Sequence, residues 1–297
     1  MIARGLVLLL AATGCVEISP GGDWEPIDAV TGPLAPEIGP VPATLDTAAD
    51  TLRVVSWNVH YGEDVAALAA AIQASPDLAT ADVVLVQEIE AHPGESTTRS
   101  RRLAEALAMT WVYAPARLDD DHSHGIAILS RYPLEDVALR ELPFIEQAVK
   151  SRNRIALAAD VTVGGRRVRI VNLHLDVRIG AGDRVRQLHG AVTDVGEAPL
   201  VVGGDFNTNP WAWVESAVPL LATEAIVGQE QAAVVDDYLG GIGLTGAVPV
   251  QTATMRLPAF QIRTDNLYAR DLRIAAGGVD YPEGSDHWAV WFDVALD

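Results

Sequence analysis

The chain has 297 residues, of which 49% are hydrophobic, and its formal net charge at pH 7 is −19. That much apolar sequence can bury one large core, so a single folded domain of about 250 residues is expected. The acidic balance excludes a basic footprint for tight nonspecific nucleic-acid binding, but a phosphate substrate stays possible because bound divalent metal supplies positive charge locally.

Residues 1–15 have the pattern of a signal peptide. Arg4 supplies a positive charge, the apolar run 6–12 is too short to span a bilayer, and the chain's single cysteine, Cys15, follows. The pattern resembles a bacterial lipoprotein signal, which is cleaved before a cysteine that becomes lipidated. This resemblance implies an extracytoplasmic protein anchored by lipid in the bacterial cell envelope, with the outer membrane or cell surface favoured. The alternative is a plain secretory signal or an uncleaved anchor with an incidental cysteine.

Residues 16–50 contain six prolines and several glycines among acidic residues. Such a segment buries too little apolar surface to offset the entropy of folding. We therefore predict a disordered tether over 16–50, followed by one domain over 51–297.

From residue 52 onward, strand and helix patterns alternate. Apolar or alternating runs predict strands over 52–59, 82–87, 126–130, 136–142, 154–163, 167–174, 200–204, 262–268, 272–279 and 288–294. Helices are predicted over 64–74, 97–109 and 184–195, and the pattern of 223–248 indicates a helix followed by a Gly-rich loop. Gly164 and Gly165 are a hairpin signal. Hairpins mixed with helical crossovers predict two stacked sheets with helices outside, an α/β sandwich.

Clusters of polar residues follow five of the apolar runs, where strands end. They are Trp57-Asn58-Val59-His60, Gln87-Glu88, Asn172-Leu173-His174, Gly204-Asp205-Phe206-Asn207 and Ser285-Asp286-His287. Carboxylates and Asn amides are the oxygen ligands that Mg²⁺ prefers, and histidines serve as acid, base or phosphate donor near neutral pH. Phosphodiester hydrolysis needs an activated water, charge neutralisation and a stabilised leaving oxygen. The clusters supply these groups and favour a metal-assisted phosphoester hydrolase.

The order of the clusters resembles the endonuclease/exonuclease/phosphatase superfamily. The seven matching motifs are Trp57-Asn58, Gln87-Glu88, the stretch 125–131, Asn172-Leu173-His174-Leu175, Gly204-Asp205-Phe206-Asn207, Thr264-Asp265-Asn266-Leu267 and Ser285-Asp286-His287. The match runs from about residue 53 to the C-terminus. It implies a four-layer α-β-β-α sandwich of the DNase I type, with the active site at one edge of the paired sheets.

The resemblance also implies a metal site. Glu88 is the principal ligand of Mg²⁺, with Mn²⁺ as an alternative; Asn58 lies close to the metal and the phosphate, and Asp286 contributes to metal binding. Abasic-site nucleases of the family carry a lysine where this chain has Glu90, which argues against a repair nuclease.

The catalytic roles follow from the same resemblance. Asp205 orients or deprotonates the attacking water, and Asn207 holds a phosphate oxygen. His287 acts against the phosphate, and Asp265 fixes its ring, a pairing that favours the imidazolium. His174 resembles the second histidine of the secreted nuclease and sphingomyelinase branches.

Five further residues leave alternatives open. His60 either contacts phosphate or metal, or makes a structural hydrogen bond. Arg152 and Arg154 either clamp a substrate phosphate or pair with carboxylates. His122 and His124 either bind a second metal or substrate, or lie in a solvated acidic loop.

We therefore predict a monomeric, Mg²⁺-dependent phosphodiesterase that uses in-line attack of water. Its substrate is nucleic acid or, alternatively, a phospholipid, sphingomyelin-type headgroup, or sugar or inositol phosphate. From another class, a noncatalytic surface lipoprotein that retains the fold is the alternative, and the complete set of acids, amides and histidines argues against it. Substrate choice depends on loops whose shape the sequence does not give.

Overall fold

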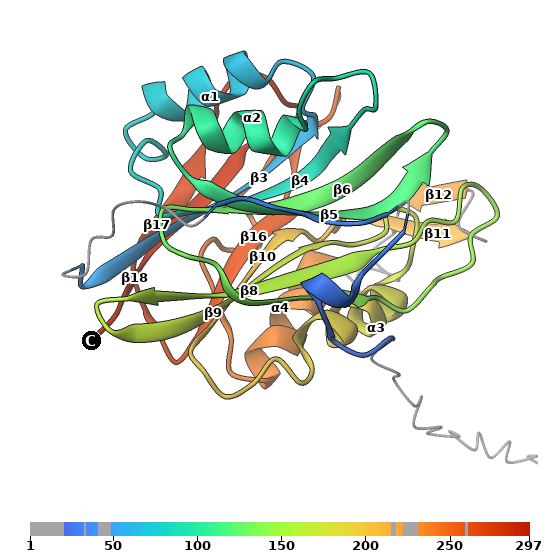
Figure 1. Cartoon of the computed structure of the whole chain (residues 1–297). Coiled ribbons are helices and arrows are strands. Elements are labelled where there is room, and N and C mark those ends of the chain that lie inside the picture. The colour runs from blue at the N-terminus through green and yellow to red at the C-terminus, as the bar shows by residue number, and fades with distance from the viewer. Residues whose placement is uncertain (1–20, 33, 41–48, 215–217, 222–230, 259–260) are drawn as a thin grey trace, which may run out of the picture.

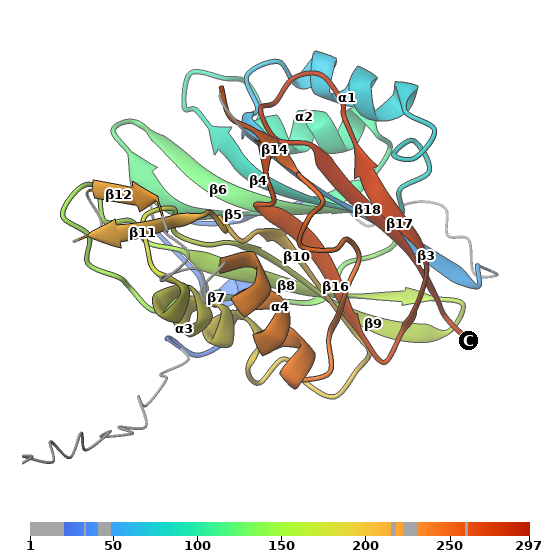
Figure 2. The ribbon, with the colours of Figure 1, turned by 180° about the vertical axis from the view of Figure 1, so that it is seen from behind.

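Two mixed β-sheets of seven strands each stack face to face, and helices cover their outer faces (Figures 1 and 2). The computed structural model describes residues 21–32, 34–40, 49–214, 218–221, 231–258 and 261–297. The first sheet has the order β17 (Arg273–Asp280), β18 (Ala289–Ala295), β3 (Thr51–Tyr61), β4 (Val83–Ala91), β6 (His122–Ser130), β5 (Thr110–Asp119) and β2 (Glu37–Ile38). The second has the order β1 (Glu25–Pro26), β7 (Glu135–Glu141), β8 (Ile155–Val163), β9 (Arg166–His174), β10 (Leu200–Asp205), β16 (Asp265–Arg270) and β13 (Thr245–Gly246).

Four helices form the outer layers. The helices α1 (Val65–Ala74) and α2 (Arg99–Ala106) pack on the first sheet, and α3 (Ala181–Val192) and α4 (Gln231–Gly241) pack on the second. Short elements complete the described chain: η1 (Ile27–Ala29), β11 (Trp211–Val214), β12 (Val218–Leu221), β14 (Met255–Arg256) and β15 (Gln261–Ile262). None of the helices in the described ranges has the length and hydropathy that crossing a membrane requires.

Three apolar layers hold the sandwich together. Successive residues of a strand face opposite sides of its sheet, so Val54 of β3 packs between the sheets while Val55 packs under α1 and α2. In the second sheet, Val201 of β10 packs between the sheets and Val202 packs under α3 and α4. Because both faces of the central strands are buried, these strands are continuous apolar runs in the sequence. The α-β-β-α sandwich predicted from the sequence is confirmed.

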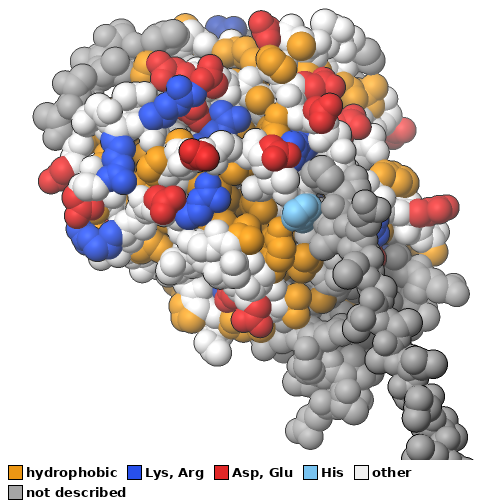
Figure 3. All heavy atoms as spheres, turned by 90° about the horizontal axis from the view of Figure 1, so that it is seen from below, with side chains coloured by type: hydrophobic (Ala, Val, Ile, Leu, Met, Phe, Trp, Pro, Cys, Tyr) orange, Lys and Arg blue, Asp and Glu red, His pale blue; other side chains and the backbone are white. Residues whose placement is uncertain are grey.

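One face of the molecule carries acidic and basic side chains in mixed form (Figure 3). In the view from below, basic side chains lie beside acidic ones instead of forming a patch of their own (Figure 3). That face therefore offers no basic track for a nucleic-acid backbone.

Two local predictions had different outcomes. The Gly164-Gly165 turn joins β8 to β9 with φ of +57° and +79°, the left-handed conformation that a tight hairpin requires. The strand β5 was not predicted, because Ala, Pro and Arg residues interrupt its pattern and Pro115 borders a bulge. Its pairing with β6 places His122 and His124 on a strand, so the alternative of a solvated loop is wrong.

The part of the predicted tether that the structure describes over 21–32 and 34–40 is folded, so the prediction of disorder is wrong for these residues. The short strand β1 pairs with β7, β2 pairs with β5, and Ile27 is buried between the sheets. The Trp24 indole donates a hydrogen bond to the Thr193 carbonyl at 3.0 Å and stacks under the Arg140 guanidinium. A few apolar side chains among the prolines are enough to attach this segment to the sheet edges. Residues 1–15, with Cys15, lie outside the described residues.

Candidate active site

The predicted site residues meet at one edge of the two sheets. In the second sheet the register pairs Asp205 of β10 with His174 of β9 on one side and with Asp265 of β16 on the other. In the first sheet, Asn58 of β3 is paired with Gln87 of β4, directly before Glu88. A cavity of about 270 Å³ opens between these strand ends, and its lining includes His60, Glu88, Asp205, Asn207, Asp286 and His287.

Asp205 is almost fully enclosed, with 1% of its surface exposed. Its carboxylate accepts hydrogen bonds from the Asn58 amide (Nδ2–Oδ2, 3.0 Å) and from the backbone N–H of Asn207 (2.8 Å). Burial, together with the nearby charge of Asp265, raises the pKa of the Asp205 carboxyl well above its usual range. Gly204 makes this placement possible, because its φ is +144° and a Cβ there would lie 2.0 Å from the Leu173 carbonyl oxygen.

His287 is held against Asp205 by Asp265. The His287 Nδ1 lies 2.9 Å from Asp265 Oδ2, so its Nε2 faces Asp205 Oδ2 at 4.0 Å. Thr254 and Thr264 donate hydroxyl hydrogen bonds to the same Asp265 oxygen at 2.9 and 2.6 Å. Burial alone would lower the pKa of His287, but the charges of Asp265 and Asp205 outweigh it and raise that pKa to about 10. The ring is therefore an imidazolium at neutral pH.

Glu88 lies at a β-bulge in β4. The β4–β6 register shifts between Gln87 and Ile89, so Glu88 is the extra residue of a β-bulge, with φ of +60°. A non-glycine residue in this conformation stores strain of about 1–3 kcal/mol, and such strain occurs most often at functional sites. The bulge turns the Glu88 carboxylate toward His174, whose Nε2 is 3.7 Å away, and leaves it 20% exposed.

The chemistry of three side chains fits a divalent cation. Glu88, His174 and Asp205 each present one ligand atom within 4.8 Å of the others. Burial, with the nearby charge of Arg154, lowers the pKa of His174 well below its ordinary value, so this ring is neutral. Its buried Nε2 has no hydrogen-bond partner among the described residues and faces two carboxylates. A buried unpaired nitrogen beside two acids is what a bound cation would satisfy.

The other residues predicted at the metal and at the phosphate make contacts of their own. The Asn58 amide oxygen accepts a hydrogen bond from the His60 backbone N–H at 3.1 Å, while its amide nitrogen holds Asp205. Asp286 lies at the rim, with Oδ1 3.0 Å from His60 Nδ1. The Asn207 amide donates to the Leu175 carbonyl at 2.9 Å, and its backbone is left-handed with φ of +51°.

The two predicted arginines lie beside this cavity, in a basic pocket. The Nε of Arg154 donates to Asp176 Oδ1 at 2.9 Å, but its buried Nη2 has no partner in the described chain. Together with Lys150, Arg152 and Arg178, this guanidinium lines a hollow of about 110 Å³. Val177 borders both this hollow and the active-site cavity, so the two are adjacent.

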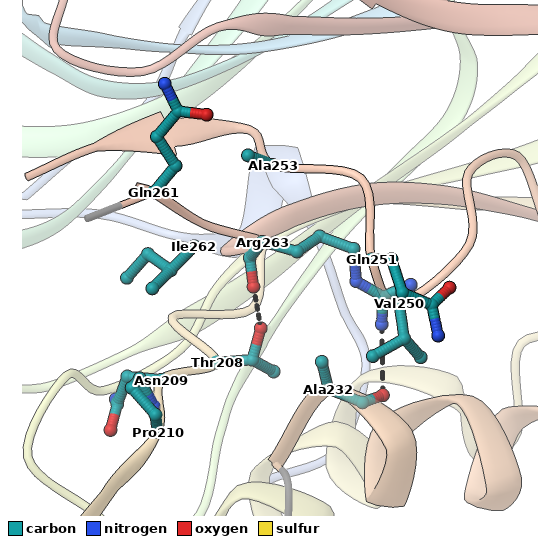
Figure 4. A pocket seen from close by; sticks show the side chains of 10 residues that line it. All are labelled: Thr208, Asn209, Pro210, Ala232, Val250, Gln251, Ala253, Gln261, Ile262 and Arg263. Atoms are coloured by element: carbon teal, nitrogen blue, oxygen red, sulfur yellow. Dashed lines mark hydrogen bonds between the residues drawn. The ribbon is translucent and has the colours of Figure 1, made fainter. Parts of the chain in front are cut away.

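A larger hollow of about 320 Å³ also adjoins the site (Figure 4). It shares Asn209 and Ile262 with the active-site cavity. Its one cation, Arg263, is engaged elsewhere, because its guanidinium pairs with Asp236 at 2.7 Å and donates to the Ala232 carbonyl at 3.0 Å. This hollow offers room for a part of a substrate that carries no strong charge.

Two buried residues support the site, and sequence reasoning assigned neither a role. The Asn172 amide crosses from the second sheet to donate to the backbone carbonyls of Val86 and Ala127, and it accepts from the Gln87 side chain at 2.8 Å. Arg184 is fully buried and donates to the carbonyls of Asp176 and Phe206, in the loops after β9 and β10. Asn172 lies in a recognised motif, whereas Arg184 looks like an ordinary solvated position on a helix.

Comparison with known proteins decides the family. The model of the endonuclease/exonuclease/phosphatase family matches residues 55–287. The chain belongs to this family. The family comprises metal-dependent enzymes that hydrolyse phosphoester bonds, so the chain is classed as such a hydrolase, and the predicted superfamily is confirmed.

Solved structures agree with this fold. A family protein from Beutenbergia cavernae is 23% identical, covering 84% of this chain and 72% of that one with a TM-score of 0.66. The human Nocturnin catalytic domain with bound sulfate is 18% identical, covering 84% and 95% with a TM-score of 0.56. The TDP2 of D. rerio in complex with a single-strand DNA product is 18% identical, covering 83% and 99% with a TM-score of 0.54. The curated proteins contain no significant match to the chain.

Proposed function

We propose that this protein is a Mg²⁺-dependent phosphodiesterase that hydrolyses its substrate by in-line attack of water. One observation carries the proposal. The buried Asp205 carboxylate lies 4.0 Å from the His287 imidazolium and 3.6 Å from the neutral His174, and Glu88 stands across the same cavity. The site thus combines a proton acceptor, a cationic hydrogen-bond donor and metal ligands around one cavity. That cavity has room for a phosphoryl group and the groups bonded to it.

Glu88 would be the principal ligand of the metal, with His174 beside it, and Mn²⁺ would serve in place of Mg²⁺. When bound, the ion supplies the positive charge that neutralises the nonbridging phosphate oxygens and the leaving oxygen. Asn58 contributes by holding Asp205, and Asp286 contributes from the rim beside His60. These assignments explain why so many acids gather at one edge.

The chain's own residues would handle the proton and the phosphate. Asp205, fixed by Asn58 and the Asn207 backbone, orients the attacking water and accepts its proton. His287, kept protonated by Asp265, donates from Nε2 to a phosphate oxygen and stabilises the charge that develops there.

Substrate and location are part of the proposal. TDP2 of D. rerio, which has this fold, was solved with a DNA product, and the basic pocket of Arg152 and Arg154 would suit a second phosphate of a polymer. The alternative is a phospholipid, sphingomyelin-type or inositol phosphate, which a lipid anchor at Cys15 in the cell envelope, at the outer membrane or cell surface, would bring close. We propose a monomer. A noncatalytic lipoprotein would have no need of the intact Asp265–His287–Asp205 arrangement.

A substrate panel tests the function. Plasmid DNA, RNA, sphingomyelin and a chromogenic aryl diester are incubated with wild type, Asp205→Ala and His287→Ala, with Mg²⁺ and with chelator. His189→Ala is the matched control, because His189 contacts Tyr238 on α4 and lies outside the site. We expect Mg²⁺-dependent turnover of at least one diester by wild type and the control alone. If wild type and the control turn over none of the substrates, or if both site variants are as active as wild type, the proposal is rejected. If a lipid headgroup is released while DNA and RNA stay intact, the nuclease assignment is rejected.

A further inference from the structure

A second group of metal-binding side chains lies outside the active-site cavity, where β4 ends beside the turn between β5 and β6. It consists of Glu90, His92 and His122, and none of the three lines that cavity. Their ligand atoms all lie within 4.8 Å of one another. The Oε2 of Glu90 is 2.8 Å from His92 Nε2, and its Oε1 is 3.3 Å from His122 Nε2.

The strand register brings these residues together. The pairing of Ala91 with Ser123 places His92 beside His122 across the end of the β4–β6 ladder. Because side chains alternate along a strand, Glu90 lies on the same face as the two histidines. The imidazole rings are stacked, with centroids 4.5 Å apart and planes 12° from parallel. The paired ends of two strands, β4 and β6, thus hold the three side chains in place.

The surroundings orient the ligand atoms. Asp121 lies on the far side of His122, with Oδ1 3.4 Å from Nδ1, which leaves Nε2 directed at Glu90. A carboxylate behind a histidine is the usual arrangement for fixing the tautomer of a metal ligand. Arg99 braces the Glu90 carboxylate at 3.2 Å and is itself paired with Glu95 at 2.9 Å, so its charge is offset within the group.

We propose that Glu90, His92 and His122 form a binding site for a divalent transition metal of the Zn²⁺ class, separate from the catalytic site. Two imidazole nitrogens and one carboxylate are the ligand set of open zinc sites, in which water takes the fourth position. Imidazole ligands favour Zn²⁺ over Mg²⁺, which prefers oxygen. The side chains of Glu90, His92 and His122 are 11%, 28% and 21% exposed, so an ion can reach them and keep a water. Binding would tie the tip of the β5–β6 hairpin to the end of β4.

Zinc binding in the presence of excess Mg²⁺ tests the proposal. The full chain is stripped with chelator, equilibrated with excess Mg²⁺ to compete at the catalytic site, and titrated with Zn²⁺; bound zinc is measured by elemental analysis. We expect wild type to hold a Zn²⁺ equivalent that the double variant His92→Ala/His122→Ala has lost. The catalytic-site variant Glu88→Gln and the matched control His189→Ala should both retain it. Asp121→Asn should retain it with about 10–100-fold weaker affinity.

A spectroscopic measurement guards against misfolding of the double variant. Co²⁺ in place of Zn²⁺ should give visible d–d absorption in wild type that Glu90→Gln and each single histidine variant weaken or abolish, while circular dichroism without metal stays unchanged. If wild type holds no Zn²⁺ against excess Mg²⁺, the site does not exist. If the double variant binds the same equivalent with unchanged affinity, the ion lies elsewhere. Either result overturns the proposal.

Discussion

The two sides of the active site are built differently. On the inner side, Asp205, Asp265 and His287 are 1%, 0% and 5% exposed, and each side chain is hydrogen-bonded. On the outer side, the side chains of Glu88, His60 and Asp286 are 20%, 51% and 41% exposed. The difference separates two tasks. Buried, fixed groups are suited to proton transfer and charge stabilisation, whereas the open side leaves room for a metal and a phosphate to enter.

The largest effect is expected on the inner side, from Asp205→Asn. The amide keeps the shape but cannot accept a proton, so kcat should fall by about 10²–10⁴-fold. Because burial disfavours the Asp205 charge, we expect the variant to unfold at the same or a higher temperature than wild type. Steady-state kinetics and thermal unfolding check both. If the variant keeps its activity, or loses it only because it unfolds, the inner side of the site does not have the proposed role in proton transfer.

On the outer side, Glu88→Gln should act through the metal. We expect the apparent Mg²⁺ affinity to fall by about 10–100-fold or more. A loss of about 10–100-fold is typical when only a residue hydrogen-bonded to a metal ligand is removed, and Glu88 is itself a proposed ligand. Activity should therefore return in part at high Mg²⁺ concentration. Titration of activity with Mg²⁺ measures this, with Asp205→Asn as the variant that added metal does not rescue. Equal rescue of both would remove the distinction between the two sides.

The link between Asp265 and His287 gives a pH signature. Asp265→Asn removes a negative charge that favours the imidazolium, so the pKa of His287 should fall from about 10 toward its ordinary value. If the protonated ring is required, activity is lost on the alkaline side, and the alkaline limb of kcat/KM should move to lower pH. The pH–rate profile of the variant checks this. An alkaline limb that stays in place would show that Asp265 only packs against the ring.

Beneath both sides, Asn172→Ala should reduce stability more than chemistry. The change removes an amide that joins the two sheets and leaves the Gln87 side chain without its 2.8 Å acceptor. The expected loss in the free energy of unfolding is about 1–3 kcal/mol. Denaturant unfolding measures it, with Asn153→Ala, at an exposed position, as the control. A larger loss of kcat than of stability would place Asn172 in the catalytic machinery.

The smallest effect is expected from Arg152→Ala in the basic pocket. Loss of one partly exposed cation should raise KM by about 5-fold, the factor for a charged contact of about 1 kcal/mol, and leave kcat unchanged. The effect should appear for an oligonucleotide and not for a small aryl diester. Arg186→Ala is a matched control, since Arg186 pairs with Asp183 on α3. An equal change for both substrates would mean that the pocket binds no second phosphate.

Much of this architecture could be predicted from local patterns. Apolar runs ending in Asn58, Glu88, His174 and Asp205 predicted strands whose ends carry polar groups, and the structure brings these residues together. Parallel pairing of β3 with β4 and of β9 with β10 accounts for this, because parallel strands end at the same edge.

The rest depends on contacts between segments far apart in the chain. No periodicity links Thr254 to Asp265, or Asn172 to the carbonyls of the opposite sheet. The folded segment around Ile27 was also not predicted. It is held by pairing with the edge strand β7 and by packing between the sheets, and neither contact can be read from the segment's own sequence. The roles of the site residues stay predictions until they are measured.

The central claim is that Asp205 directs water onto phosphorus in a metal-dependent step. Single-turnover hydrolysis of a diester in ¹⁸O-labelled water, with and without Mg²⁺, tests it most directly. We expect label in the phosphoryl product of wild type only when Mg²⁺ is present, formed about 10²–10⁴-fold more slowly by Asp205→Asn. Label in the alcohol product, or equal rates for the variant or without metal, would contradict the account.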